Sequence, residues 1–408
     1  MCSKTRPIQP TILFGAFDRD NFGDLLFPHV AARLLDTENL LFAGLAERDL
    51  CGAGGYRTRA ISQLVKELGE HPVNILHVGG ELLTCNAWQA AVILQPSEKV
   101  QSIIQRLEGD PDARNEWIRH QMGFTALAPY ALARELFRGT VWVIYTAVGG
   151  VELKERDEPF RTEVITKLKD ADYVSARELQ TQAYLKNFGI HCHLAPDPAV
   201  MVAELFGARI EKHAQGREVA SPRAAFPDGY MACQFSADFG DDATLRQMAV
   251  QLDQLAEASG FGIVLFRAGA APWHDDLDCY RRLVKFTKSA QVRIFESLNI
   301  WDICALIAQS RVFCGSSLHG RIVAMAFGLP RVNLNHPHKE SRTGKQAAYA
   351  ATWELPGIPA TVDIAGIAAG VLQAIAHDED QLHVHAQALV AKYLEEFTTV
   401  RALLDNRT

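Results

Sequence analysis

Residues 311–330 have the sequence RVFCGSSLHGRIVAMAFGLP. An apolar run before the serines predicts a buried strand, and an apolar segment of helical period follows them. Ser316 or Ser317 can cap that helix, because a serine hydroxyl accepts a hydrogen bond from a free amide of the first turn. Gly328 and Pro330 then supply the signals that end it. The stretch therefore predicts a strand, a tight turn and a helix, which is the repeating unit of an α/β fold.

The same alternation of short Val- and Ile-rich runs with helical segments extends over nearly the whole chain. The strands expected in the first half are 11–17, 39–43, 73–78, 141–145, 173–176 and 191–194. Those expected in the second half are 230–235, 262–266, 292–295, 311–314 and 331–334. This order is typical of βαβ units around parallel sheets, whose binding loops follow the carboxyl ends of the strands. We therefore predict the α/β fold class, with two Rossmann-like domains facing a cleft.

A polar, proline-bearing stretch at residues 211–228 marks the expected domain boundary, and 408 residues suit two domains. We expect an N-terminal domain over 1–205 and a C-terminal domain over 206–375. A helix within 376–408 then packs back across the first domain. Residues 84–139 have helical sequence without a strand signal. They form either an inserted helical subdomain near the cleft or a long helical crossover.

The charge balance of the chain excludes two classes of partner. With 41 Lys and Arg against 48 Asp and Glu, the net charge is −7, so no overall positive field attracts nucleic acid or an anionic membrane surface. The longest apolar stretches fall short of the roughly 20 residues that cross a bilayer, so we expect no transmembrane segment. Any anion that the protein binds must therefore meet a local cluster of cations.

The cysteines and the N-terminal residues favour a cytoplasmic location. The eight cysteines are scattered without a CxxC motif, as expected for reduced thiols of a cytosolic protein. The first residues lack the apolar region and small-residue cleavage site of a secretory signal. His191 and His193 would share one face of a strand, but the sequence offers no evident third and fourth ligand. We therefore expect cytoplasmic localisation and no metal site.

Two basic residues occupy the first turn of the helix after Ser317. His319 and Arg321 lie where the helix dipole is positive, which disfavours a cation by about 0.3 to 1 kcal/mol. A bound phosphate or carboxylate would compensate, since backbone amides, the serine hydroxyls and the Arg321 guanidinium would all reach it. The dipole also favours the neutral imidazole of His319, which can then exchange a proton. The alternatives are an Arg321 that points into solvent and a His319 that only packs.

A second loop, GAFDRDNFGD at residues 15–24, follows the first expected strand. It lacks the GxGxxG pattern of a dinucleotide site, Asp24 would itself cap the next helix, and Asp18 and Asp20 would repel phosphate. We therefore predict that this loop holds hydroxyl groups, with Asn21 and Asp24 as the contacts. The alternative is that Asp24 is a helix cap and nothing more.

Three further residues follow expected strands. Arg177 comes directly after 173–176, Arg267 ends 262–266, and His274 stands a few residues later. Two arginines that end buried strands indicate a cleft that gathers cations for a small anion. The alternative for each residue is a solvated charge at the surface.

Six motifs stand in a fixed order along residues 11–334. They are NFGD at 21–24, GGELL at 79–83, SARE at 175–178, APDPA at 195–199, HDD at 274–276 and GSSLHG with its later GLP at 315–330. Together they resemble the polysaccharide pyruvyl transferase family. The resemblance implies a fold similar to the two-domain GT-B glycosyltransferases. It also implies transfer of a pyruvyl group from phosphoenolpyruvate to sugar hydroxyls as a ketal.

The resemblance gives the candidate residues their roles. Phosphoenolpyruvate carries a carboxylate and a phosphate, so its site needs several cations held close together. His319 is the expected catalytic acid or base. The expected donor-binding residues are Arg177, Ser316, Ser317, Arg321, Arg267 and Lys345. The expected acceptor-binding residues are Asn21, Asp24 and His274, with residues 84–139 on the acceptor side and 206–375 on the donor side. The scheme requires no metal and no cofactor, because phosphoenolpyruvate is a co-substrate.

One position departs from the family pattern. Many members have Arg-Leu-His where this chain has Ser317-Leu-His319, so an arginine that would touch the donor is absent. Arg321, two residues after the histidine, is the expected replacement. Lys345 is the expected counterpart of a family lysine that lies beyond the last strand of the second domain.

Three functions remain open from the sequence. The first is a pyruvyl transferase acting in exopolysaccharide or cell-wall biosynthesis, on a polysaccharide or glycan precursor that is free or lipid-linked. The second is a GT-B glycosyltransferase with a nucleotide-sugar donor, because the two Rossmann-like halves suit both. The third is a non-catalytic relative, because of the arginine that Ser317 replaces.

Overall fold

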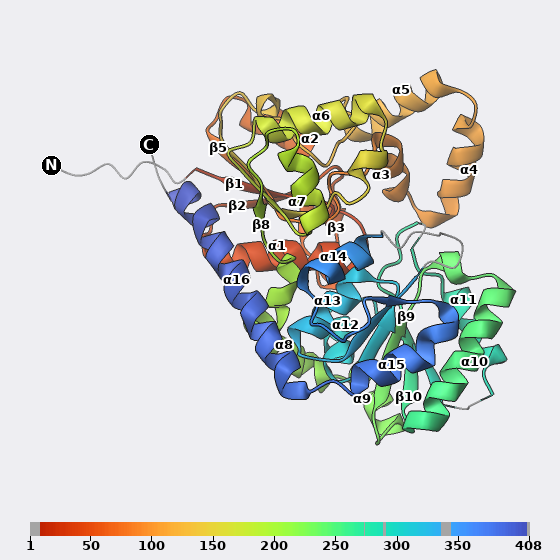
Figure 1. Cartoon of the computed structure of the whole chain (residues 1–408). Coiled ribbons are helices and arrows are strands. Elements are labelled where there is room, and N and C mark those ends of the chain that lie inside the picture. The colour runs from red at the N-terminus through yellow and green to blue at the C-terminus, as the bar shows by residue number, and fades with distance from the viewer. Residues whose placement is uncertain (1–8, 273, 289–290, 336–343, 406–408) are drawn as a thin grey trace.

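The structure of the chain is a computed structural model. It describes residues 9–272, 274–288, 291–335 and 344–405. The N-terminal residues 1–8, and Arg342 beside the predicted Lys345 contact, lie outside these ranges. Two β-sheets lie one above the other, each with helices packed on it, and the C-terminal helix runs along one side of both (Figure 1).

The first sheet has eight strands in the order β3-β4-β2-β1-β5-β6-β7-β8. Their bounds are β1 Thr11–Phe14, β2 Leu40–Gly44, β3 Arg48–Asp49, β4 Arg57–Ala60, β5 Val73–His77, β6 Thr140–Val148, β7 Tyr173–Ala176 and β8 His193–Leu194. Every pairing is parallel except that of β3 with β4. Strand order reverses at β1, whose neighbours are β2 and β5, and such a switch point opens a crevice at the carboxyl ends of the strands.

The second sheet has six parallel strands in the order β11-β10-β9-β12-β13-β14. Their bounds are β9 Tyr230–Gln234, β10 Gly262–Phe266, β11 Val292–Phe295, β12 Val312–Gly315, β13 Arg331–Leu334 and β14 Thr361–Val362. Its switch point is β9, whose neighbours are β10 and β12. The predicted fold class, two Rossmann-like α/β domains, is therefore confirmed.

Helices connect the strands in both halves. Those before β9 are α1 Phe22–Leu35, α2 Ile61–Leu68, α3 Ala87–Ile93, α4 Ser97–Leu107, α5 Pro111–Met122, α6 Glu158–Lys169, α7 Leu179–Lys186, α8 Val202–Ala214 and α9 Arg217–Ala225. Those after it are α10 Asp242–Ser259, α11 Leu277–Phe286, α12 Ile300–Ala308, α13 Leu318–Ala326, α14 Lys345–Trp353, α15 Ile367–Ile375 and α16 Glu379–Asp405. Single 3₁₀ turns are η1 Cys51–Ala53, η2 Arg134–Leu136, η3 Leu153–Glu155, η4 Pro198–Met201, η5 Ala237–Phe239 and η6 Ile364–Gly366. No helix among the described residues combines the length and the apolar character that crossing a membrane requires.

The observed elements differ from the predicted ones in two places. The short strands β3, β4 and β14 carry no run of apolar residues, so the hydrophobic pattern gave no signal for them. The polar stretch 211–228 is largely helical, since it holds the end of α8 and all of α9, with Pro222 inside the helix and buried. Residues 84–139 contain α3, α4 and α5 and join β5 to its neighbour β6.

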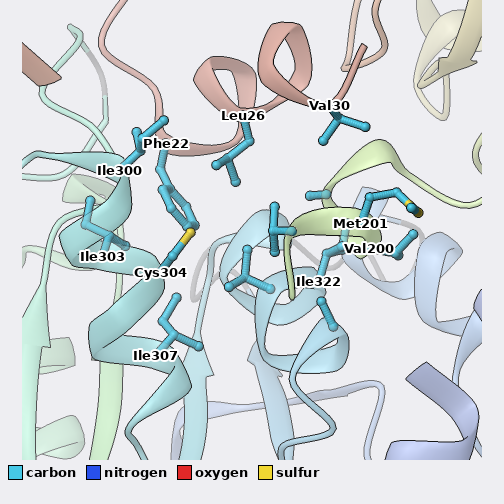
Figure 2. Close-up of a cluster of buried hydrophobic side chains, with 14 of the residues drawn as sticks. Phe22, Leu26, Val30, Val200, Met201, Ile300, Ile303, Cys304, Ile307 and Ile322 are labelled. Carbon is cyan, nitrogen blue, oxygen red and sulfur yellow. The ribbon is translucent and has the colours of Figure 1, made fainter. Parts of the chain in front are cut away.

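An apolar layer ties the two halves together. In Figure 2, Phe22, Leu26 and Val30 of α1 face side chains of α12, η4 and α13 from the other side of the layer. These partners are Ile300, Ile303, Cys304, Ile307, Val200, Met201 and Ile322, all buried. Each buried side chain of this size contributes about 1.5 to 3 kcal/mol. The loops at the start of α1 and α13 are therefore held in a fixed relation to each other.

The C-terminal helix α16 braces both halves. It runs from the second sheet to the first along one side of the molecule (Figure 1). Its Glu396 accepts a hydrogen bond from Tyr173 of β7 at 3.0 Å. Its Leu389, Tyr393 and Phe397 are buried in the same apolar layer as α1 and α13. The helix therefore closes the side of the layer that the other helices leave open.

Candidate functional site

A cavity of about 460 Å³ lies between the two halves. Its walls are loops that follow the carboxyl ends of β1, β5, β6 and β7 in the first sheet and of β9, β10, β12 and β13 in the second. Both switch points therefore open into the same cleft. We call it the interdomain cleft.

His319 reaches from the first turn of α13 across to α1. A Cβ on Gly23 would lie 1.8 Å from His319 Nδ1, so the glycine leaves the space that the ring occupies. The ring packs edge-on against Phe27, with ring centroids 5.2 Å apart. Its Nε2 is enclosed without a hydrogen-bond partner in the described part of the chain and lies 3.6 Å from Oδ2 of Asp197. The side chain keeps 13% of its surface exposed and lines the cleft.

Arg177 lies beside this histidine, enclosed by three carboxylates. Its Nη1 binds Asp197 at 3.1 Å, its Nε binds Glu178 at 2.6 Å, and its Nη2 binds Glu81 at 2.6 Å. A Cβ on Gly149 would lie 2.5 Å from both Arg177 Nη2 and Glu81 Oε2, so this glycine permits the pair to form. Each nitrogen of the guanidinium is therefore already bound to a carboxylate of the protein.

Arg177 and its three carboxylate partners form a cluster that contains more acidic than basic groups. Burial raises the pKa of Glu178 to about 7, although Arg177 stabilises its carboxylate. Burial also favours the neutral acid of Asp197, but His319 and Arg177 outweigh it and the pKa of Asp197 is lowered. Glu81 is the third carboxylate on the single guanidinium. Three carboxyl groups therefore surround a single guanidinium.

Gln234, the last residue of β9, organises the start of α13. Its Oε1 accepts a hydrogen bond from the Ser317 amide at 2.7 Å, and its Nε2 donates to both carboxylate oxygens of Asp275 at 2.8 Å. Desolvation raises the pKa of Asp275 to about 7, although the amides of Ala268 and Gln234 stabilise its charged form. A carboxyl group that keeps a proton near neutral pH therefore stands in the cleft wall.

The first turn of α13 faces the cleft with unoccupied amides. Ser317 caps the helix, because its hydroxyl accepts from the Gly320 amide at 3.1 Å. Within the described residues, the amides of Leu318 and His319 have no acceptor. The predicted Ser316 also lines the cleft, and its hydroxyl accepts from a backbone amide at 3.0 Å. Free amides at the positive end of a helix dipole favour a bound anion.

The loop after β1 forms the opposite wall. Asn21, not Asp24 as expected, caps α1 and accepts from the amides of Gly23 and Asp24 at 3.2 and 3.3 Å. Asp24 instead binds Arg19, with the Arg19 Nη2 at 3.0 Å from Asp24 Oδ2. Asn21 and Asp24 both line the cleft.

His274 joins this wall from the second half of the chain. Burial lowers its pKa to about 4, and the nearby cations Arg19 and Lys345 add to the effect. The ring is therefore neutral at pH 7, and its Nε2 lies 3.4 Å from Asn21 Nδ2, which can donate to it. This contact brings together two predicted acceptor residues that are 253 positions apart.

Two cations line the cleft, and neither is enclosed by carboxylates in the described residues as Arg177 is. Arg156 follows η3, and its Nε is enclosed without a hydrogen-bond partner in the described residues, while its Nη2 is 4.0 Å from Glu152. Lys345 is exposed at the start of α14 and has no ion pair within the described ranges. Gln346 donates to the Ser316 carbonyl at 2.7 Å, which fixes the start of α14 beside that of α13. Lys345 is therefore held next to the free amides.

Arg321 is the principal correction to the sequence analysis. Its side chain is fully buried and binds Glu354 at 2.6 Å, with further hydrogen bonds to Asn333 and to two backbone carbonyls. Arg331 binds the other carboxylate oxygen of Glu354 at 2.5 Å. Two residues along a helix point about 200° apart, so Arg321 faces away from the cleft that His319 enters. It does not replace the arginine that Ser317 displaces.

Two other predicted donor-binding arginines have carboxyl groups of the protein nearby. Arg177 lines the cleft, but its guanidinium is enclosed by its three carboxylates. Arg267 is not among the residues that line the cleft and lies near Asp20, whose pKa is raised by desolvation and lowered in part by Arg267. Both arginines follow parallel strands, so the sequence predicted that they lie at the carboxyl end of a sheet. The direction of each side chain then determined which groups it contacts.

Several residues of the site were not predicted from the sequence. Arg19, Glu81, Arg156 and Gln234 all line the cleft, and Asp197 supports His319 from behind. The signal available for Arg156 was Gly149-Gly150, which follows the long strand β6 as Gly79-Gly80 follows β5. Glu81 and Asp197 stood in the motifs GGELL and APDPA, but only the fold shows that both meet Arg177.

Neither of two other features adds to this site. Among the described residues, no group of three or more His, Cys, Asp or Glu is arranged to hold a metal ion. Of the paired histidines, His193 lies 3.5 Å from Glu396 of α16. A second cavity of about 710 Å³ lies at the amino ends of β9 and β12, against Arg223 and Arg311. It is therefore at the opposite end of the second sheet from the binding loops.

The model of the polysaccharide pyruvyl transferase family matches residues 117–338 of the chain. This match covers more than half of the 408 residues and includes Asp197, Gln234 and His319. This chain belongs to the polysaccharide pyruvyl transferase family. The resemblance drawn from its motifs is confirmed. No curated protein sequence matches this family member.

Solved structures of similar fold share little sequence with this family member. The Anabaena HepE protein, solved in complex with UDP and glucose, has a TM-score of 0.56 and 11% identity, over 97% of this chain and 100% of that chain. The putative UDP-N-acetylglucosamine 2-epimerase from Listeria monocytogenes has a TM-score of 0.55 and 10% identity, over 93% and 91%. The trehalose 6-phosphate synthase from Burkholderia multivorans has a TM-score of 0.50 and 12% identity, over 97% and 98%. At such identities the likeness shows the GT-B-type fold.

Proposed function

We propose that this family member transfers a pyruvyl group from phosphoenolpyruvate to two hydroxyls of a sugar, as a ketal, in the interdomain cleft. The observation that carries the proposal is the start of α13. There the unoccupied amides of Leu318 and His319, the cation Lys345 and the imidazole of His319 meet in one wall. Phosphoenolpyruvate offers that wall two anionic groups on a three-carbon frame.

Of the cations that the sequence indicated for the donor, only Lys345 is retained in this proposal, and Arg156 is added. Lys345 has no ion pair in the described residues, and Arg156 has a partnerless Nε and one long contact, to Glu152 at 4.0 Å. The planar guanidinium of Arg156 suits a carboxylate or phosphate. Arg19 is neutralised by Asp24 and Arg177 by its three carboxylates. We therefore assign the phosphate and the carboxylate of the donor to Arg156, Lys345 and the α13 amides.

His319 moves the protons of the addition step. Its ring gives a proton to the methylene carbon of phosphoenolpyruvate, so that C2 becomes electrophilic. The oxygen of the first sugar hydroxyl bonds to C2, and the proton of that hydroxyl returns to the ring. Phosphate then leaves with the electrons of its bond to C2. The second hydroxyl bonds to C2 and passes its proton to the departing phosphate, which completes the ketal.

The acceptor lies against the wall that follows β1. Asn21 and His274 present polar groups to the cleft, and Asp24 presents a carboxylate already bound to Arg19. Gln89 of α3 adds an amide from the segment 84–139. This mixture of amide, imidazole and carboxylate suits hydroxyl groups. The acceptor we propose is a polysaccharide or glycan precursor in the cytoplasm.

The first experiment measures phosphate release from phosphoenolpyruvate with a panel of free, nucleotide-linked and lipid-linked sugars, with the product identified by mass. Acceptor-dependent release is expected, and His319→Gln should abolish it. His120→Gln, at an exposed histidine in the last turn of α5, is the matched control and should keep the wild-type rate. Equal rates in the His319 variant and the control would contradict the catalytic role.

The second experiment tests the donor by thermal unfolding. A ligand at 100 times its dissociation constant stabilises a fold by about 2.7 kcal/mol. Phosphoenolpyruvate should stabilise the wild type and the Arg106→Ala control, where the arginine is exposed on α4, but not Arg156→Ala. Stabilisation by UDP-sugars alone would instead favour a nucleotide-sugar donor, which the fold likeness to a protein solved with UDP supports. Binding of phosphoenolpyruvate without turnover of any acceptor would favour the non-catalytic relative.

A further inference from the structure

The enclosed nitrogen of His319 is the feature that the proposed function leaves unexplained. Nε2 has no hydrogen-bond partner within the described residues, although burying a polar nitrogen without one costs about 1 to 3 kcal/mol. The nearest charged group is Oδ2 of Asp197, at 3.6 Å. The ring is also tightly placed, between Gly23 and Phe27. The histidine is thus fixed facing a carboxylate, at a distance slightly too long for a hydrogen bond in the free protein.

The carboxylate of Asp197 is held in one orientation by its hydrogen bonds. It is fully buried, and its Oδ1 caps η4 by accepting from the Ala199 amide at 3.0 Å. Its Oδ2 accepts from Arg177 Nη1 at 3.1 Å and faces His319. Arg177 is held in turn by Glu81 and Glu178. The carboxylate is therefore fixed from two sides, with one oxygen aimed at the imidazole.

We infer that Asp197 is a positioning residue that acts through His319, and that His319 exchanges protons with the reactants through Nδ1. This inference rests on the proposed function for its reaction. Nε2 keeps its hydrogen toward Asp197, so Nδ1 is the nitrogen left for the methylene carbon and the sugar hydroxyl. When Nδ1 carries a proton as well, the charge of the ring is balanced by the carboxylate.

The hydrogen bond tightens when the donor is bound. Catalytic hydrogen bonds are often long in free enzymes and shorten in the complex. Nε2 and Oδ2 are 3.6 Å apart, so a displacement of Nε2 by a few tenths of an ångström brings the two atoms within hydrogen-bond distance.

The test compares two carboxylates that bind the same arginine. Asp197→Asn removes the charge that faces His319, and Glu178→Gln removes a charge from Arg177 without a contact to His319 in the described residues. We expect Asp197→Asn to lower kcat by about 10² to 10⁴, with the KM for phosphoenolpyruvate changed by no more than a few-fold. Its pH–rate profile should move to lower pH, because the protonated ring loses its counter-charge. Glu178→Gln, which weakens the same arginine cluster without a contact to His319 in the described residues, should lower kcat and move the profile by much less than Asp197→Asn.

A second readout needs no substrate. The ring resonances of His319, assigned by their absence from His319→Gln, are followed by NMR against pH in each variant. We expect the His319 titration to move toward acid in Asp197→Asn and to move much less in Glu178→Gln, whose carboxylate does not face the ring. If the titration moves but phosphoenolpyruvate is not turned over by any variant, the proposed function fails and the pairing stands.

Two results would overturn the inference. One is an Asp197→Asn variant with the wild-type kcat and the wild-type His319 titration. The other is a Glu178→Gln variant that loses as much kcat as Asp197→Asn does. That result would assign the loss of activity to the Arg177 cluster as a whole. If Asp197→Asn does not fold, Asp197→Ser replaces it, because a serine can still cap η4 while removing the carboxylate.

Discussion

Gly23→Ala is the sharpest perturbation that the structure offers. The new methyl carbon would stand 1.8 Å from His319 Nδ1 and 2.0 Å from its Cγ, whereas ordinary contacts begin at 3.4 Å. The ring must therefore withdraw by about 1.6 Å, or α1 must move. Movement of α1 is resisted by Phe22 and Leu26, which are buried in the apolar layer between the halves. The imidazole is the part that yields.

The expected loss follows from the displacement. A misplacement of about 1 Å costs on the order of 10² in rate, and general acid–base catalysis contributes about 10² to 10⁴. We therefore expect kcat to fall by about 10² to 10⁴, which is about 3 to 5 kcal/mol of transition-state stabilisation. Overpacking should also lower the free energy of unfolding by about 1 to 3 kcal/mol. The KM for phosphoenolpyruvate should change little, because Arg156, Lys345 and the α13 amides are not touched.

The assay is acceptor-dependent phosphate release, with thermal unfolding of each variant as the measure of folding. Gly207→Ala is the matched control, because this glycine also lies within a helix, α8, and a Cβ there meets nothing within 4 Å. It should keep full activity and gain up to about 1 kcal/mol of stability. A folded Gly23→Ala protein with the kcat of Gly207→Ala would refute the placement of His319 against α1.

Three further outcomes are expected. Arg321→Ala should lose about 3 to 5 kcal/mol in the free energy of unfolding, because it breaks a buried ion pair with Glu354. Phosphoenolpyruvate should still raise the melting temperature of this variant. A folded variant whose melting temperature no longer responds to phosphoenolpyruvate would show that Arg321 binds the donor. Burial lowers the pKa of His29 to about 4, so below pH 6.5 the unfolded chain binds the proton more readily, and stability should fall by about 3 kcal/mol between pH 6.5 and 4. Denaturant titration of His29→Gln should show a flatter dependence over that range, and an unchanged slope would contradict the shift. Gly149→Ala should destabilise the fold by about 1 to 3 kcal/mol, because its methyl group would separate Arg177 from Glu81. A melting temperature equal to that of the wild type would show that the ion pair accommodates the methyl group.

Most strands of the two sheets could be predicted because short runs rich in apolar residues alternate with helical segments. A continuous apolar run such as 262–266 is typical of a strand in the interior of a parallel sheet. The same pattern fails at β3 and β14, two-residue strands at the sheet edges with no apolar run. Motif order along the chain also sufficed for the family, since it depends on residue identity and not on contacts.

The roles of the arginines could not be predicted, because a guanidinium on a long side chain binds whatever anion the fold brings near. Arg321 and Glu354 are 33 positions apart, and Arg177 and Glu81 are 96 apart. Nothing local in the sequence pairs them. Arg156, which keeps a free nitrogen in the cleft, lies eight positions beyond β6, not directly at its end.

The sequence by itself therefore determined the α/β fold class, the family and the wall of the cleft that carries His319. Each follows from hydrophobic period, turn residues or motif identity within a short stretch of chain. Only the tertiary structure decided which cations in the cleft are enclosed by carboxylates of the protein and which carboxylate faces His319. Both depend on side chains from distant segments that meet after folding, because charge pairing inside a protein is set by distance and burial, and neither is a property of one segment.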